Sequence, residues 1–156
     1  MKRSLGLFCL LLALSVSVWA QGSPEEEAKP ALPQNLAAYK GKLPDKFMKL
    51  PAVKKRLQAL LKGGYGDFVK RMGVQTPFTR QGDFLVATGQ IAHMGGSEEA
   101  ILVIDLNAKA LACAMFSDGT IGLKPRNVPG LNVSTEKSLP APLNDWLAEK
   151  QKLLDK

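Results

Sequence analysis

The sequence contains very little of the chemistry on which most active sites depend. Its 156 residues include one histidine, His93, and two cysteines, Cys9 and Cys113. No paired-histidine zinc motif, Gly-x-Ser-x-Gly motif or phosphate-binding glycine loop occurs. Acidic residues are available, but no pattern assigns two of them to one cleft. We therefore expect no enzymatic activity, no cofactor and no metal.

Long apolar runs are also scarce, and the one that is present lies at the N-terminus. Lys2 and Arg3 precede an apolar run over residues 5–18, which ends at Ala20. A short basic region, an apolar stretch of this length and a small residue at its end are typical of a secretory signal peptide. We expect residues 1–20 to be cleaved near Ala20 and the protein to be periplasmic or secreted, with no membrane span.

Cleavage leaves Cys113 as the lone cysteine. One cysteine can form neither an internal disulfide nor a thiolate metal site. Cys113 lies within an apolar, strand-like run, so we expect it to be a small buried side chain.

The pattern of residues along the remaining chain predicts a single domain of the α+β class over residues 35–156. Residues 21–34 are rich in glutamate and proline and predict a disordered linker. Apolar spacing predicts helices first, then short strands of an antiparallel meander, then a closing helix. We expect the helices to pack on one face of the sheet. The expected elements are helices from 51 to 62 and near 68–72, strands at 83–88, 100–106, 110–116, 120–123 and 131–135, and a helix over 143–154.

Positive charge is concentrated in one half of the chain. Residues 40–80 carry eleven basic and two acidic side chains, a net charge of +9, whereas residues 81–137 carry four and six, a net charge of −2. Such a basic half either coats helices with lysine or faces an anionic surface. Export and the absence of a recognition motif argue against nucleic acid. The candidate basic residues are Lys40, Lys42, Lys46, Lys49, Lys54, Lys55 and Arg56.

The segment from Gly89 to Ser97 stands out because it carries the only imidazole and joins two predicted strands. Gly95 and Gly96 allow the backbone to turn sharply beside His93. On composition alone, the preferred interpretation is an ordinary flexible loop with a solvated histidine.

The order of motifs resembles the inhibitor of vertebrate lysozyme (Ivy) family. The resemblance covers residues 43–123 and includes the run Met72-Gly73-Val74-Gln75-Thr76-Pro77, a following strand and a His-x-x-Gly-Ser loop. It implies that the loop enters the cleft of a c-type lysozyme, with His93 contacting the catalytic carboxylates. The implied inhibitory loop comprises Gln90, Ile91, Ala92, His93, Met94, Gly95, Gly96 and Ser97.

This loop departs from the family pattern at three positions. The family commonly closes the loop with a disulfide between the positions of Gln90 and Gly95, and it commonly has an acidic residue where this chain has Met94. We therefore expect a more mobile loop and weak or absent inhibition. Glu98 and Glu99 are expected to supply negative charge beside the loop, since c-type lysozymes are basic.

Several functions fit these observations. The target could be a c-type lysozyme, the cell's own lytic transglycosylase, or a rival's cell-wall toxin to which this chain gives immunity. Alternatively, the chain is an exported module with the same fold that binds an anionic envelope surface without inhibiting an enzyme. The oligomeric state stays open, a homodimer included.

Overall fold

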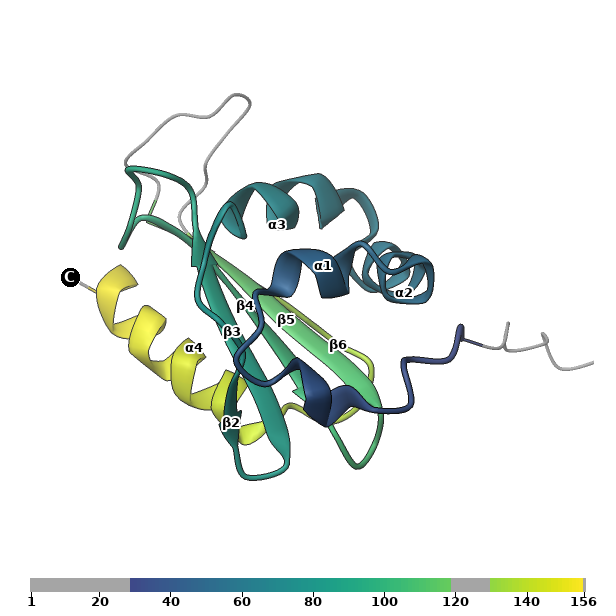
Figure 1. Ribbon diagram of the computed structural model, residues 1–156. Coiled ribbons are helices and arrows are strands. Elements are labelled where there is room, and N and C mark those ends of the chain that lie inside the picture. Colours follow the sequence, from purple (N-terminus) through teal and green to yellow (C-terminus); the bar gives the residue numbers. More distant parts are fainter. Residues whose placement is uncertain (1–28, 119–129, 156) are drawn as a thin grey trace, which may run out of the picture.

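The computed structural model describes residues 29–118 and 130–155, apart from the side chains of residues 130 and 131. Helices come first, then strands, then a final helix, as the sequence predicts (Figure 1). The elements are η1 (Leu36–Tyr39), α1 (Pro44–Met48), α2 (Pro51–Leu61), η2 (Lys62–Gly64), α3 (Tyr65–Arg71), β1 (Val74–Gln75), β2 (Thr79–Gln81), β3 (Phe84–Gln90), β4 (Glu98–Asp105), β5 (Ala110–Ser117), β6 (Gly130–Thr135) and α4 (Ala141–Leu154).

The strands form one six-stranded antiparallel sheet. The strands β3, β4, β5 and β6 lie side by side in chain order, and the short strands β1 and β2 both pair with the outer edge of β3. The α+β class and the antiparallel meander are therefore confirmed. The strand predicted over 131–135 is β6, whereas the one predicted over 120–123 lies outside the described residues.

The helices α1–α3 cover one face of the sheet (Figure 1). Pro51 occupies the first turn of α2, where a missing N–H costs nothing. Val53, Leu57 and Leu61 then recur every four residues, and all three are buried against the sheet. The helix ends at Leu61, and η2 with Gly63 and Gly64 leads into α3. Local apolar spacing thus accounts for this layer.

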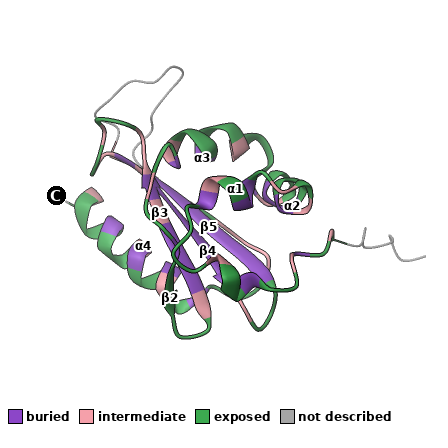
Figure 2. Cartoon of the chain, in the orientation of Figure 1, coloured by how far each residue is buried: buried purple, intermediate pink, exposed green. Residues whose placement is uncertain are grey.

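The helix α4 covers the opposite face, so the expectation that all helices pack on one face is wrong. Leu143 and Trp146 of α4 contact Val86, Ile101 and Phe116 in a second apolar cluster. Figure 2 shows buried residues both along the sheet and on the inner side of α4. A sheet with both faces covered has strands that are apolar at nearly every position, as in β5, where all eight residues are buried.

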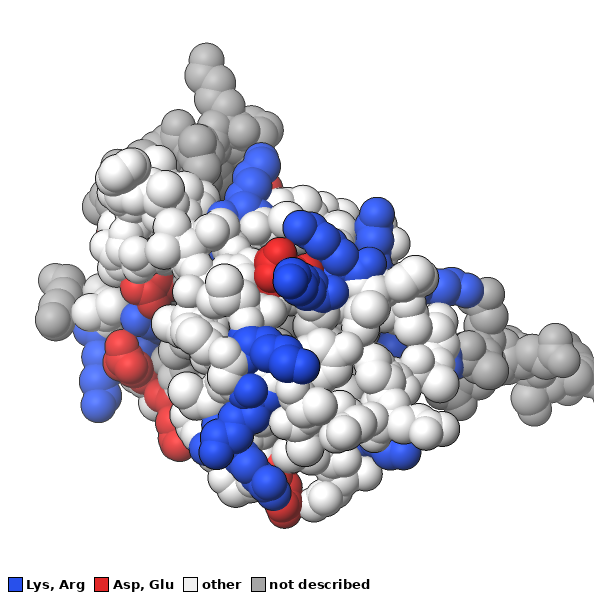
Figure 3. Space-filling view, viewed as in Figure 1, with Lys and Arg blue, Asp and Glu red and all other residues white. Residues whose placement is uncertain are grey.

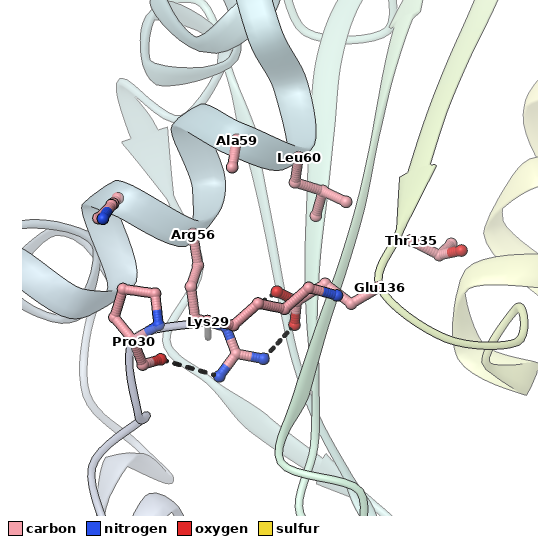
Figure 4. A pocket seen from close by; sticks show the side chains of 8 residues that line it. Lys29, Pro30, Arg56, Ala59, Leu60, Thr135 and Glu136 are labelled. Carbon is pink, nitrogen blue, oxygen red and sulfur yellow. Dashed lines mark hydrogen bonds and ion pairs between the residues drawn. The ribbon is translucent and has the colours of Figure 1, made fainter. Parts of the chain in front are cut away.

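The N-terminal segment joins the core through apolar and polar contacts. Residues 21–28 of the predicted linker lie outside the described residues, while Leu32 is buried in the same cluster as α2. Arg56 of α2 donates to the Glu136 carboxylate and, at 3.4 Å, to the carbonyl oxygen of Pro30 (Figure 4). The Arg56 guanidinium also donates to the carbonyl oxygen of Lys109 at 3.0 Å. One side chain thus joins four segments of the chain.

Cys113 is a buried side chain in β5, as predicted. Burial, with a smaller contribution from the Glu136 carboxylate, raises the pKa of the Cys113 thiol to about 12. The thiol is therefore kept in its unreactive, protonated form.

Candidate partner-binding site

The candidate site is the connection between β3 and β4, residues 91–97. It extends beyond the end of the sheet, away from the β4–β5 turn (Figure 1). Ala92, His93, Gly95 and Gly96 are exposed, and the other residues of the connection are half-buried (Figure 2). The sequence-predicted residues are therefore together in one protruding loop.

Two successive turns shape this loop. The Met94 N–H donates to the Ile91 carbonyl at 3.0 Å, and the Met94 carbonyl accepts from the N–H groups of Ser97 and Glu98, both at 3.1 Å. The base is closed by the Ile91 N–H, which donates to the Glu98 carbonyl at 3.1 Å. The loop backbone is thus bonded to itself at both turns and at its base.

His93 occupies the third position of the first turn with a φ of +64°. A positive φ is required there in type II and type I′ turns, and histidine tolerates it better than most side chains. Among the residues that the structure describes, none forms a hydrogen bond or ion pair with the His93 imidazole. The turn therefore presents an imidazole that is available to a partner.

Gln90 and Gly95 stand at the positions where the family commonly has its disulfide, and they lie against each other. A Cβ atom added at Gly95 would be 2.6 Å from Oε1 and 3.1 Å from Cδ of Gln90. The end of the Gln90 side chain therefore packs against Gly95, so the two positions are in contact without a covalent bond. The sequence predicted a mobile loop because the disulfide is missing. In the structure, this non-covalent contact and the turn hydrogen bonds constrain the loop.

On the face of the sheet covered by α3, Glu98 fixes the end of the loop. Its side chain is fully buried and forms an ion pair with Arg71 at the end of α3. The Ser117 hydroxyl donates to Glu98 Oε1 at 2.6 Å. Because a buried carboxylate is stable only when paired and hydrogen-bonded, this arrangement links the loop to both α3 and β5.

On the opposite face, Glu99 makes the equivalent link to α4. Its Oε2 lies 2.7 Å from Nζ of Lys150, and its Oε1 accepts from the Gly96 N–H at 2.8 Å. Burial by itself would lower the pKa of Lys150, but hydrogen bonds to Glu99 and Glu149 outweigh it, so the pKa of Lys150 is raised. The ammonium group stays charged and holds Glu99 against the loop.

These ion pairs correct the expected role of Glu98 and Glu99. The sequence suggested that they supply free negative charge beside the loop, yet Glu98 is paired with Arg71 of α3 and Glu99 with Lys150 of α4, a cation that Glu99 shares with Glu149. The sequence did indicate that the side chains of Glu98 and Glu99 lie on opposite faces of the sheet, because consecutive residues of a strand point to opposite faces. What the sequence could not show is which cations they would meet.

The predicted basic surface is present except for Arg56. Lys and Arg side chains gather on the face formed by α1, α2 and α3 (Figure 3). Lys42, Lys46 and Lys54 contribute to it, while Lys49 pairs with Asp45 at 3.4 Å. Arg56 is buried and paired with Glu136, so it cannot contribute to an exposed surface.

A shallow pocket beside Arg56 does not coincide with the loop. It measures about 240 Å³ and is lined by three apolar residues, Pro30, Ala59 and Leu60, and by five polar or charged ones, Lys29, Lys55, Arg56, Thr135 and Glu136 (Figure 4). Residues 29–118 and 130–155 contain no cluster of metal-ligating side chains. No helix within these ranges is long and apolar enough to cross a membrane.

Comparison with protein families places the chain in one family. The family model described as inhibitor of vertebrate lysozyme (Ivy) matches residues 52–152. The chain belongs to the Ivy family. No curated protein and no solved structure matches the chain. Membership in the Ivy family supports a general role as a lysozyme inhibitor and implies a lysozyme partner. It is consistent with a periplasmic or secreted protein.

Proposed function

We propose that this chain is an exported inhibitor of a lysozyme-type, peptidoglycan-cleaving enzyme, and that it acts by inserting the loop 91–97 into the enzyme's cleft. The observation that carries the proposal is the exposed imidazole of His93 at the first turn of a protruding loop in a member of the Ivy family. The chain acts as a binding partner and performs no catalysis.

The chemistry of the target suits an imidazole. Two carboxyl groups flank the glycosidic bond that a lysozyme cleaves. An imidazolium group has two N–H donors, so His93 placed between the carboxylates donates one hydrogen bond to each. Charge-assisted hydrogen bonds of this kind are about twice as strong as neutral ones.

Order in the free loop favours binding. A loop that is already shaped loses less conformational entropy on docking. The turn hydrogen bonds of Ile91 and Met94, together with the contact between Gln90 and Gly95, provide such order without a disulfide. Inhibition therefore does not require the covalent clamp.

Charge attraction contributes little to this association. The loop contains no acidic side chain, and the two glutamates after it are paired within the chain. Both this protein and a c-type lysozyme are basic, so their long-range interaction is repulsive, and salt screens that repulsion. We expect that inhibition does not fall steeply as the ionic strength rises.

The test is an inhibition assay against c-type lysozymes and bacterial lytic transglycosylases, comparing the protein without residues 1–20 with its His93→Gly variant. Glycine preserves the positive-φ turn and removes only the imidazole. Losing hydrogen bonds to charged groups weakens binding by about 10- to 100-fold. Lys109→Gly is the matched control, because Lys109 also has a positive φ (47°) but lies in the turn at the other end of the sheet.

Two results would refute the proposal. One is the absence of inhibition across the whole panel, and the other is equal inhibition by the parent protein and His93→Gly. A cell-wall toxin included in the panel extends the same test to the immunity function.

The exposed lysines favour a second candidate, which is binding to an anionic envelope surface. The basic face of α1, α2 and α3 has few acidic neighbours (Figure 3). Binding to anionic lipid vesicles that falls steeply with salt and is unchanged by His93→Gly would support this candidate. Vesicle binding that is absent at low salt would exclude it.

A further inference from the structure

The two glutamates that follow the loop leave it toward opposite faces of the sheet. Glu98 lies on the face that packs on α3, and Glu99 lies on the face that packs on α4. Each meets a cation from the helix on its own side, Arg71 or Lys150. Adjacent residues of a single strand therefore link the loop to two helices that are far apart in the sequence.

We propose that Arg71 and Lys150 are positioning residues for the inhibitory loop, and that their ion pairs with Glu98 and Glu99 substitute for the disulfide that this loop lacks. The inference rests on the proposed function of the loop, but the ordering of the loop can be measured without an enzyme. Neither cation needs to touch the target.

The setting of Lys150 indicates that its role is not simply stability. Its side chain is 7% exposed, and the ammonium group lies 5.8 Å from the Phe116 ring and 5.7 Å from the Trp146 ring. Lys150 Nζ pairs with Glu99 at 2.7 Å and with Glu149 at 3.1 Å, but the Glu149 side chain is 68% exposed and the Glu99 side chain only 17%. Because an exposed pair contributes little to stability, the contact through which this lysine acts on the loop is the one with Glu99.

Glu99 contacts both Lys150 and the backbone of the loop. One carboxylate oxygen contacts Lys150 at 2.7 Å while the other accepts the Gly96 N–H at 2.8 Å. Gly96 has a φ of +87° and open space around it, so no side-chain packing fixes its conformation. The carboxylate of Glu99 therefore connects the second turn of the loop to α4, in addition to the backbone hydrogen bonds within that turn.

The other link is deeper and is less suitable for a test. Arg71 donates to the Phe116 carbonyl at 3.4 Å in addition to its pair with Glu98. Removing Arg71 would leave the fully buried Glu98 without its ion pair, which strongly destabilises a fold. The pair of Lys150 with Glu99 is better suited to a test, because Glu99 is partly exposed and losing its partner should affect the position of the loop more than the stability of the fold.

The decisive variant is Lys150→Met, which keeps the length and apolar character of the side chain. We expect the amide hydrogen of Gly96 to exchange about tenfold faster, and inhibition to weaken about tenfold, because a charge-assisted contact is lost. Lys150→Arg should retain both. Lys152→Met is the matched control, since Lys152 is an exposed lysine of the same helix. If Lys150→Met does not fold, Glu99→Gln neutralises the same pair without disturbing the aromatic rings.

An engineered disulfide then tests whether Lys150 acts through the loop. In the Lys150→Met background, Gln90→Cys and Gly95→Cys would install the missing bond. The atoms that a Cβ at Gly95 would meet belong to Gln90, so that substitution also removes the obstruction. Cys113 is buried and does not compete. We expect the oxidised protein to recover the inhibition of the parent, and a reductant to abolish the recovery.

The outcomes separate the two proposals. Equal Gly96 exchange in the parent and in Lys150→Met would overturn the positioning role, whatever the inhibition data show. Failure of the oxidised disulfide to restore inhibition would overturn it as well. If no enzyme is inhibited by the parent protein, the proposed function fails, while the exchange measurement still decides whether Lys150 orders the loop.

Discussion

Gly89 is the position at which the structure predicts the largest effect from the smallest change. It lies in β3 between Gln75 of β1 and Ala100 of β4, just before the inhibitory loop. The end of α3 crosses directly over it. A Cβ atom at Gly89 would lie 2.7 Å from the Met72 Cα and 2.8 Å from the Arg71 carbonyl oxygen.

Gly89→Ala should therefore destabilise the protein strongly. Two of the three nearest atoms that the new methyl group would meet belong to the backbone, so they cannot rotate away as the third, Met72 Sδ at 2.9 Å, could. Either β3 or the end of α3 must move, and overpacking of this kind costs about 1–3 kcal/mol. We expect a loss of about 2 kcal/mol, and a displaced Arg71 would also loosen its pair with Glu98.

Urea denaturation followed by circular dichroism measures this loss. With a slope of about 2 kcal/mol/M, the midpoint should fall by about 1 M. Gly66→Ala is the matched control: it lies within α3, and a Cβ there meets nothing within 4 Å. Because alanine favours a helix over glycine, this variant should gain about 0.5–1 kcal/mol. Equal midpoints for the two variants would refute the close approach of α3 to β3.

Two further predictions concern buried groups. Arg56→Met should cost about 3–5 kcal/mol in urea denaturation, because the Glu136 carboxylate keeps its burial and loses its ion pair; a cost under about 1 kcal/mol would contradict this. The raised pKa of Cys113 favours the protonated thiol in the folded state, so its contribution is complete below pH 9 and is lost as the pH rises toward about 12. At about 1.4 kcal/mol per pH unit, the parent should lose about 2 kcal/mol more than Cys113→Ala between pH 8 and pH 10.5, and parallel pH profiles would refute it.

The elements that depend on nearby residues were predictable from the sequence. The spacing of Val53, Leu57 and Leu61 predicts α2 because side chains four residues apart share a helix face. Short apolar runs separated by turns predict a meander, since antiparallel strands need only tight connections. The protruding position of the loop at 91–97 follows from the same reasoning.

The site's supporting contacts were not predictable, because they join residues far apart in the chain. Glu98 and Arg71 are separated by 27 residues, and Arg56 and Glu136 by 80. In the sequence these four residues resemble ordinary surface charges. Only packing decides that a charge is buried, and burial then makes an ion partner necessary.

Residue order and apolar spacing were thus sufficient for the α+β class, the antiparallel meander and a histidine on a strand connection, because each depends on contacts within a few residues. The placement of α4 on the second face, the burial of Arg56 and the pairing of Glu99 with Lys150 arose only from tertiary packing. The reason is physical, because a side chain contacts residues distant in the sequence only after the sheet has brought them together. Its exposure then determines whether its charge is solvated by water or needs a partner within the protein.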